Sequence, residues 1–252
     1  MRGIEVCANS LPSALAAQEG GAIRVEFCDN LAEGGTTPSA GQLQLAREML
    51  GIELWPIIRP RGGDFLYTGL EYSVMKADIE FCKSTGCDGI VTGILDQDGN
   101  IDLARMAELI ALAAPLPVAF HRAFDMTNAP CQALEDLIRL GIVRILTSGA
   151  GKSAIAGKDT IADLVRQAAG RIEIMPGAGV NAQNIAELAT TGAEQFHASC
   201  KVHIPSNMLF RNTDALMGSL TDEYSFEQTT PEKVRELVDA LNSLPAHVYT
   251  TG

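Results

Sequence analysis

The chain has 252 residues, of which 46% are hydrophobic and 20% charged, a composition typical of a globular protein with a sizeable core. Its formal net charge of −12, without any cluster of lysine or arginine, excludes non-specific binding to nucleic acids or anionic membranes. Local binding of an anionic small molecule remains compatible with this charge. No apolar run approaches the length of a membrane span.

Short apolar strands alternate with amphipathic helices along most of the chain. Residues 4–9 and 24–29 are expected to form the first two strands, with a helix over 11–20 between them. In chain order, further strands are expected at 54–60, 89–95, 117–124, 144–149, 172–177 and 195–199, and further helices at 38–50, 71–86, 102–114, 130–140, 154–169 and 182–191. Residues 201–228 show little periodicity and are expected to form a long loop before a last helix over 231–243.

Strict alternation of strands and helices predicts a parallel sheet. Eight repeats predict an α/β fold of the (β/α)8 TIM-barrel type rather than a doubly wound open sheet, which more often has five or six strands. We expect the barrel over residues 1–200 and a C-terminal extension, with its final helix, over 201–252 in the same domain. Functional side chains of such barrels lie where the strands end and the loops to the helices begin.

The chain is expected to work in a reducing compartment. Its first residues lead directly into an apolar strand without a secretory signal, and its six cysteines show no paired spacing. Both features favour a cytoplasmic protein with reduced thiols over a secreted disulfide framework.

The first two strands end in the same unusual pattern, Glu5-Val6-Cys7 and Glu26-Phe27-Cys28. Alternate side chains of a strand share a face, so two carboxylates and two thiols would converge if these strands are parallel neighbours. Cys7 and Cys28 could then hold Cu(I), because thiolates are soft ligands and neighbouring strands lie about 4.8 Å apart. The alternatives are two buried cysteines that only pack the barrel, or a mixed site in which Glu5 and Glu26 join the thiols.

Two histidines also end strands. His121 is followed by Arg122 and Asp125, which offers a base, a cation and an orienting carboxylate within one loop. His197 is expected to bond a neighbouring carboxylate at the barrel rim. If the protein is an enzyme, Glu5, Glu26, His121 and Asp125 are the candidates for proton transfer.

Two further segments are suited to an anion. Arg59 and Arg61 precede a glycine turn and could clamp a carboxylate or phosphate, or could instead neutralise Glu5 and Glu26 in a buried ion-pair network. The loop that contains Gly177 and Gly179 follows the seventh strand, where barrels commonly hold phosphate on backbone amides, and Ser199 would complete such a pocket. The alternative is a glycine-rich turn required only for tight packing.

Six longer motifs lie at these strand ends, and in them the chain resembles the copper homeostasis CutC family. The motifs are Leu-Ala-Glu-Gly-Gly-Thr-Thr-Pro-Ser (31–39), Ile-Arg-Pro-Arg-Gly-Gly-Asp-Phe-Leu-Tyr (58–67), Phe-His-Arg-Ala-Phe-Asp (120–125), Arg-Ile-Leu-Thr-Ser-Gly (144–149), Ile-Met-Pro-Gly-Ala-Gly-Val-Asn (174–181) and Phe-His-Ala-Ser (196–199). The resemblance implies a TIM barrel and a cytoplasmic homodimer associated with copper tolerance. It carries no enzyme activity with it.

Two functions from different classes therefore stand side by side. The first is copper homeostasis, with Cu(I) bound by Cys7 and Cys28 at the barrel mouth. The second is an enzyme or a sensor for a small anionic or phosphorylated metabolite, bound by Arg59, Arg61 and the 177–181 loop. Neither a strand-end lysine nor a nucleophile elbow points to a particular reaction.

Overall fold

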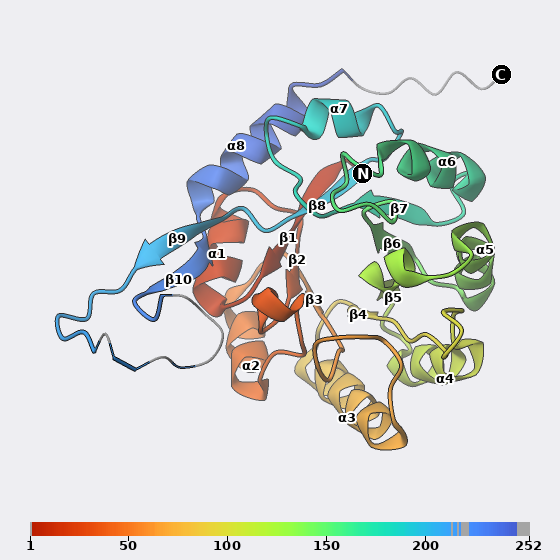
Figure 1. Ribbon diagram of the computed structural model, residues 1–252, viewed down its shortest axis with the longest axis horizontal. Helices are drawn as coiled ribbons and strands as arrows, with labels where there is room; N and C mark the ends of the chain where they lie inside the picture. Colours follow the sequence, from red (N-terminus) through yellow and green to blue (C-terminus); the bar gives the residue numbers. More distant parts are fainter. Residues whose placement is uncertain (1, 213, 216, 218–221, 246–252) are drawn as a thin grey trace.

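Eight parallel strands form a barrel at the centre of the molecule, and helices surround it (Figure 1). The computed structural model describes residues 2–212, 214–215, 217 and 222–245. The barrel strands are β1 (Gly3–Ala8), β2 (Arg24–Phe27), β3 (Glu53–Pro56), β4 (Ile90–Thr92), β5 (Val118–Phe120), β6 (Arg144–Thr147), β7 (Glu173–Pro176) and β8 (Gln195–Ala198). The predicted (β/α)8 fold is thereby confirmed.

The barrel consists of two four-stranded sheets, β3-β2-β1-β8 and β4-β5-β6-β7. A parallel bridge from Ile57 to Val91 joins β3 to β4, and β7 lies beside β8. Pairing of β8 with β1 brings the last strand next to the first, so residues far apart in sequence share one site. Within the described residues, no helix is long and apolar enough to cross a membrane.

The helices follow the strands in the predicted order. They are α1 (Leu11–Glu19), α2 (Ala40–Met49), α3 (Gly69–Thr85), α4 (Leu103–Ala113), α5 (Pro130–Leu140), α6 (Lys158–Ala168), α7 (Ile185–Ala189) and α8 (Pro231–Asn242). Local signals set their ends, as α3 illustrates. The Thr68 hydroxyl accepts the Glu71 N–H, the Glu71 carboxylate accepts the Thr68 N–H, and Gly86 ends the helix with a φ of 80°.

The fifth strand is shorter than the expected 117–124. It ends at Phe120 because the His121 side chain accepts the N–H of Ala123 and thereby begins a 3₁₀ helix, η2 (Arg122–Met126). His121 consequently leaves the strand but stays buried at its carboxyl end. Gly93 makes this possible, because a Cβ at that position would lie 2.7 Å from Cε1 of His121.

The expected loop over 201–228 is wrong in part, because it contains two strands. β9 (Lys201–Pro205) and β10 (Ser225–Thr229) pair antiparallel and project from the barrel as an arm (Figure 1). Along β9, exposed residues alternate with half-buried ones, and β10 has one buried residue, Thr229, so the arm lacks the continuous buried run that marks the barrel strands. After the arm, α8 packs on α1 and adds Val234, Leu237 and Leu241 to the hydrophobic core.

Another short 3₁₀ helix, η1 (Leu31–Glu33), follows β2 and covers the site described next. Its flanking residues Asn30 and Gly34 have φ values of 46° and 84°, in the left-handed region that favours asparagine and glycine. The turn places Leu31 against Cys7, Cys28 and Ile57.

Candidate metal and ligand pocket

A pocket of about 470 Å³ opens at the carboxyl ends of the barrel strands. Its position agrees with the place where (β/α)8 barrels carry their functional sites. Acidic, basic, thiol and apolar groups line it: Cys7, Glu26, Leu31, Gly34, Ile57, Arg59, Phe65, His121, Arg122, Asp125, Met126, Leu146, Ala178, Gly179, His197, Ala198, Ser199 and Lys201.

The register of β1 and β2 brings the two predicted cysteines together. The strands are parallel neighbours, with Cys7 opposite Glu26. The Sγ atoms of Cys7 and Cys28 lie 3.5 Å apart, and the Cys7 Sγ lies 3.8 Å from Oε1 of Glu26. Both thiols are buried, so water does not compete freely for them.

The pairing of β1 with β8 adds His197 to this group. Glu5 lies opposite His197 in the register, and its Oε1 is 2.9 Å from His197 Nδ1, as expected of a rim histidine bonded to a carboxylate. Ligand atoms of Cys7, Glu26 and His197 all lie within 4.8 Å of one another, close enough to share a metal ion. Cys28 contacts Cys7 and extends this group on one side.

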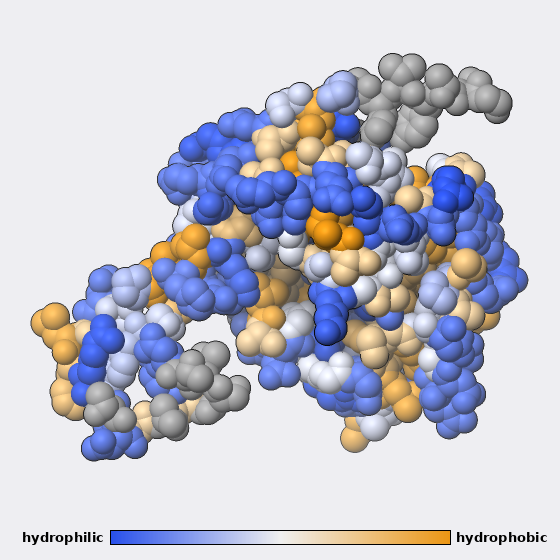
Figure 2. All heavy atoms as spheres, turned by 45° about the horizontal axis from the view of Figure 1, so that its top comes forward, coloured by the Kyte–Doolittle hydropathy of each residue, from blue (hydrophilic) through white to orange (hydrophobic). Residues whose placement is uncertain are grey.

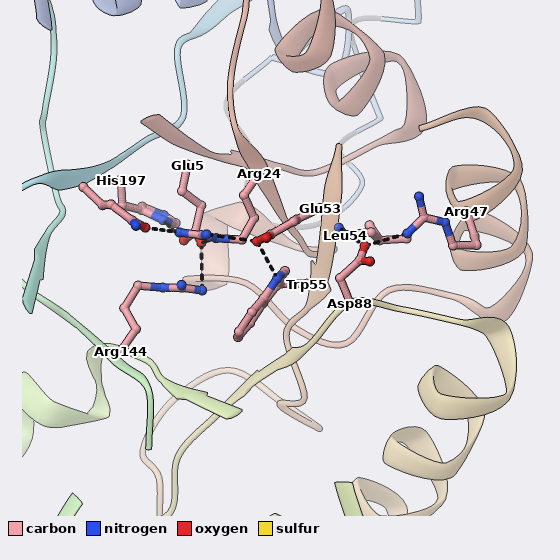
Figure 3. A network of polar contacts seen from close by, with 10 residues as sticks. Glu5, Arg24, Arg47, Glu53, Leu54, Trp55, Asp88, Arg144 and His197 are labelled. Carbon is pink, nitrogen blue, oxygen red and sulfur yellow. Dashed lines mark hydrogen bonds and ion pairs between the residues drawn. The ribbon is translucent and has the colours of Figure 1, made fainter. Parts of the chain in front are cut away.

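Glu5 lies at the centre of a buried ionic network (Figure 3). Its Oε2 accepts from Arg24 Nε at 2.5 Å and faces Arg144 Nη2 at 3.2 Å. Both guanidinium groups also lie over the Trp55 ring, with 5.5 Å from Arg24 and 4.3 Å from Arg144 to its centroid. Glu5 is therefore neutralised by Arg24 and Arg144, and not by Arg59 or Arg61 as one of the sequence alternatives had it.

The network separates the protonation states of the two strand glutamates. Burial alone would raise the pKa of Glu5, but Arg144, His197 and Arg24 together hold it well below its usual range. Burial raises the pKa of Glu26 to about 7, against the opposing attraction of His197. Glu5 is thus a fixed negative charge, whereas Glu26 exchanges a proton near neutral pH.

The pKa values of the Cys7 thiol and the His197 imidazole are both raised. The contact with Cys28, followed by burial, raises the pKa of the Cys7 thiol. Burial opposes the positive form of His197, but Glu26, Cys7 and Glu5 outweigh it and raise the pKa of His197 well above its usual value. Cys7 and His197 therefore keep their protons in the free protein, and a cation that bound these side chains would displace the protons.

Asp125 and His121 occupy different environments on the same loop. The Asp125 carboxylate accepts from Thr147 Oγ1 at 2.5 Å and from the Ser148 N–H at 3.0 Å, and it pairs with Arg122 at 2.8 Å. These bonds hold the loop after β6 to the loop after β5. Burial, together with the nearby Arg59, lowers the pKa of His121 to about 3, so this imidazole is neutral.

The structure separates the two arginines that follow β3. Arg59 is buried and lines the pocket, whereas Arg61 lies outside it and pairs with Asp64 and Glu71 at 2.8 and 2.6 Å. The chain turns at Pro60, so the two side chains do not form a joint clamp in this conformation.

The loop after β7 contributes backbone to the pocket wall. Ala178 and Gly179, with φ values of 76° and 81°, line the pocket together with Ser199. Gly177 lies behind them, where its N–H bonds the Thr147 carbonyl and a Cβ would lie 2.5 Å from the Leu146 side chain. Gly177 therefore serves close packing, while Gly179 and Ser199 face the ligand space.

The sequence analysis did not single out Arg24 and Arg144 as site residues. The sequence nevertheless contained a pattern that indicates buried arginines, because Arg24 shares its strand face with Glu26 and Arg144 begins an apolar strand. An arginine inside such a strand requires a buried carboxylate partner. Arg24 also bonds the exposed carboxylate of Glu53 at 3.1 Å. Glu53 thus extends the ionic network of Glu5 away from the pocket.

The fold and the pocket define a (β/α)8-barrel protein with a cysteine, histidine and carboxylate cluster at its mouth. The family model described as the CutC family matches residues 2–202. A relative from Chromobacterium violaceum, described as family protein CutC, is 53% identical over 95% of this chain and 98% of its own length. The human copper homeostasis protein cutC homolog is 48% identical over 93% of this chain and 87% of its own length. The chain therefore belongs to the CutC family of copper homeostasis proteins.

Solved structures agree with this assignment. The crystal structure of the putative copper homeostasis protein CutC from Streptococcus agalactiae has a TM-score of 0.76 and 38% identity, covering 79% of this chain and 99% of that one. Thiamine phosphate pyrophosphorylase from Pyrococcus furiosus has a TM-score of 0.60 at 12% identity, covering 95% of both chains. This second likeness shows the shared barrel fold alone.

Proposed function

We propose that this protein binds Cu(I) through Cys7 and Cys28 and handles copper in the cytoplasm. The observation that carries the proposal is the 3.5 Å separation of the two buried Sγ atoms beside the pocket. Thiolates select Cu(I) over the hard cations that carboxylates alone would take. Membership of the copper homeostasis family supports the same metal.

The sulfur separation favours a bent rather than a linear centre. Two metal–sulfur bonds of about 2.3 Å that span 3.5 Å enclose an angle of about 100° at the metal. Such an angle suits three or four ligands, so a further donor is needed. His197 is the candidate, because its ring nitrogen and the Cys7 Sγ lie within 4.8 Å of each other and imidazole is a good ligand for copper.

Glu5 acts behind the metal ligands. Its bond to Nδ1 of His197 fixes the imidazole ring and leaves Nε2 as the atom available to a metal. Glu26, 3.8 Å from the Cys7 Sγ, is placed to take up a proton that Cys7 releases on binding.

Anaerobic titration with Cu(I) against a competing chelator tests this proposal. We expect one tight Cu(I) per chain in the wild type, loss of that site in Cys7→Ser/Cys28→Ser, and weaker binding in His197→Gln. Cys131→Ser is the matched control, because this thiol is exposed on α5 and far from the cluster in sequence. Unchanged Cu(I) affinity in the double variant would contradict the assignment.

We also propose a reducing compartment and a homodimer. All six cysteines are free thiols, which supports the cytoplasm. Met208, Leu209 and Phe210 follow β9 in the segment that joins the two strands at the far end of the arm, and they are 60%, 100% and 75% exposed. Figure 2 shows hydrophobic atoms at this end. Exposed apolar side chains clustered on a projecting element favour contact with a second copy of the chain.

A further inference from the structure

The pocket is far larger than a metal ion requires. Its volume of about 470 Å³ falls in the range of small-molecule sites, roughly 300–1,000 Å³. Leu31, Ile57, Phe65 and Leu146 give it apolar walls beside the polar groups. This combination is typical of a site for a small organic molecule that a few polar contacts orient.

One wall of the pocket carries a buried cation without a counter-ion. Arg59 is 4% exposed, and within the described residues no carboxylate lies at ion-pairing distance from it. Its Nη atoms donate to the carbonyls of Glu33, Gly35 and Gly63 at 2.7 to 2.9 Å. Nε is buried and has no acceptor. A buried guanidinium whose Nη atoms donate only to neutral carbonyls favours a negative charge nearby.

The neighbouring cations of the same pocket differ from Arg59 in this respect. Arg122 pairs with Asp125 at 2.8 Å, and Lys201 pairs with Glu227 at 2.5 Å. Their charges are therefore balanced within the protein. Among the cations that line the pocket in the described part of the chain, Arg59 is the one without a carboxylate at ion-pairing distance.

A second buried donor lies close to Arg59. The Nδ1 atom of His121 accepts the Ala123 N–H at 3.2 Å, so the proton of the neutral ring resides on Nε2. This Nε2 is buried and has no acceptor. The Phe65 ring connects the two donors, because its centroid lies 5.0 Å from the His121 ring and 5.0 Å from the Arg59 guanidinium carbon.

We propose that this pocket binds a small organic anion whose carboxylate or phosphate lies against the side chains of Arg59 and His121, which line the pocket. The apolar part of the ligand lies against Phe65, Leu31 and Ile57. The anion supplies the negative charge that Arg59 lacks within the protein. The inference stands apart from the copper proposal, because it uses neither cysteine.

Calorimetric titration of the metal-free full chain with three matched probes tests this inference: phenyl phosphate, phenylacetate and benzyl alcohol. We expect at least one anion to bind with a Kd below about 1 mM, and the neutral alcohol at least about tenfold more weakly. The better anion identifies phosphate or carboxylate as the preferred head group. Arg59→Lys and His121→Asn should each weaken binding by about tenfold or more. Arg166→Gln, which changes an exposed arginine on α6, is the control and should bind as the wild type does.

Several results would overturn the inference. They are equal binding of benzyl alcohol and the anions, absence of binding by both anions to the wild type, or unchanged affinity in both pocket variants. The wild-type titrations decide the matter even if Arg59→Lys fails to fold. Cys7→Ser/Cys28→Ser should still bind the anion, so failure of the copper proposal and failure of this inference give different results.

Discussion

At the scale of single residues, the barrel interior depends on charge compensation as well as on apolar packing. Glu5 is fully buried and contacts Arg24, Arg144 and His197. Removal of one member of a buried ionic group is costly because it leaves the remaining charges unpaired in a medium that solvates them poorly. The same carboxylate also orients the His197 ring, so stability and the candidate site share one residue.

Glu5→Gln is expected to destabilise the protein by about 3–5 kcal/mol, because two buried guanidinium groups lose their partner. Urea unfolding at pH 7, followed by circular dichroism, measures this free energy. Glu135→Gln, which breaks the exposed pair with Arg171, is the control and should cause a far smaller loss. Equal losses of unfolding free energy in the two variants would show that burial of the Glu5 network does not add to stability.

His121 should make stability depend on pH. Its pKa is lowered to about 3 in the folded protein, against about 6.5 in an unfolded chain. Between these values the unfolded state binds the extra proton, so the free energy of unfolding rises with pH and falls as the solution is acidified. We expect His121→Asn to flatten this dependence between about pH 6 and pH 4, by up to about 1.4 kcal/mol per pH unit.

Urea unfolding of both proteins across this pH range provides the measurement. His203→Asn, a change of an exposed histidine on β9, serves as the control and should leave the slope as it is in the wild type. Parallel stability curves for wild type and His121→Asn would refute the prediction.

At the scale of elements, register determines which side chains meet. Parallel pairing of β1 with β2 and with β8 places Cys7 opposite Glu26 and Glu5 opposite His197. The C-terminal elements behave differently from each other. The arm lies on the surface, whereas α8 buries Val234, Leu237 and Leu241 against the barrel.

Leu237→Ala should cost about 2–5 kcal/mol of stability, because Leu237 is 1% exposed and its removal leaves a cavity in the core. Leu209→Ala on the arm removes the same atoms from a side chain that is 100% exposed, and the stability of the monomer should hardly change. Thermal and urea unfolding of the two variants compare these effects. A small loss in Leu237→Ala would mean that α8 contributes little to the fold.

At the scale of the whole molecule, the barrel and the arm differ in exposure. The barrel brings residues from β1, β2 and β8 to one mouth and keeps them buried. The arm extends away from this core (Figure 1) and places apolar side chains in solvent. Exposed apolar clusters of this kind are often sites of protein–protein contact.

If the arm forms the dimer contact, Leu209→Asp/Phe210→Asp should convert the protein from a dimer to a monomer of 26.8 kDa. Size-exclusion chromatography with light scattering measures the mass. Leu70→Asp on α3, where the side chain is 82% exposed, is the matched control and should remain dimeric. A wild type that is monomeric at all concentrations would exclude the homodimer.

The sequence by itself determined the barrel, most of its element order and the identity of several pocket residues. Alternation of apolar runs with amphipathic helices is a local property, and so are the glycine and proline signals at the helix ends. The motifs around Cys7, Cys28 and His121 could therefore be assigned to strand ends before any contact was known. The arm was missed because its strands are only five residues long and mostly exposed or half-buried, so the short alternation of Val202 and Ile204 in β9 did not stand out from the surrounding polar residues.

Only the tertiary structure decided which charged groups meet. Sequence proximity suggested a joint role for Arg59 and Arg61, but the turn between them directs one into the pocket and the other to surface carboxylates. The partners of Glu5 are separated from it by up to 192 positions in the chain. Closure of the barrel, which pairs the last strand with the first, is what brings them together, and no local pattern encodes that distance.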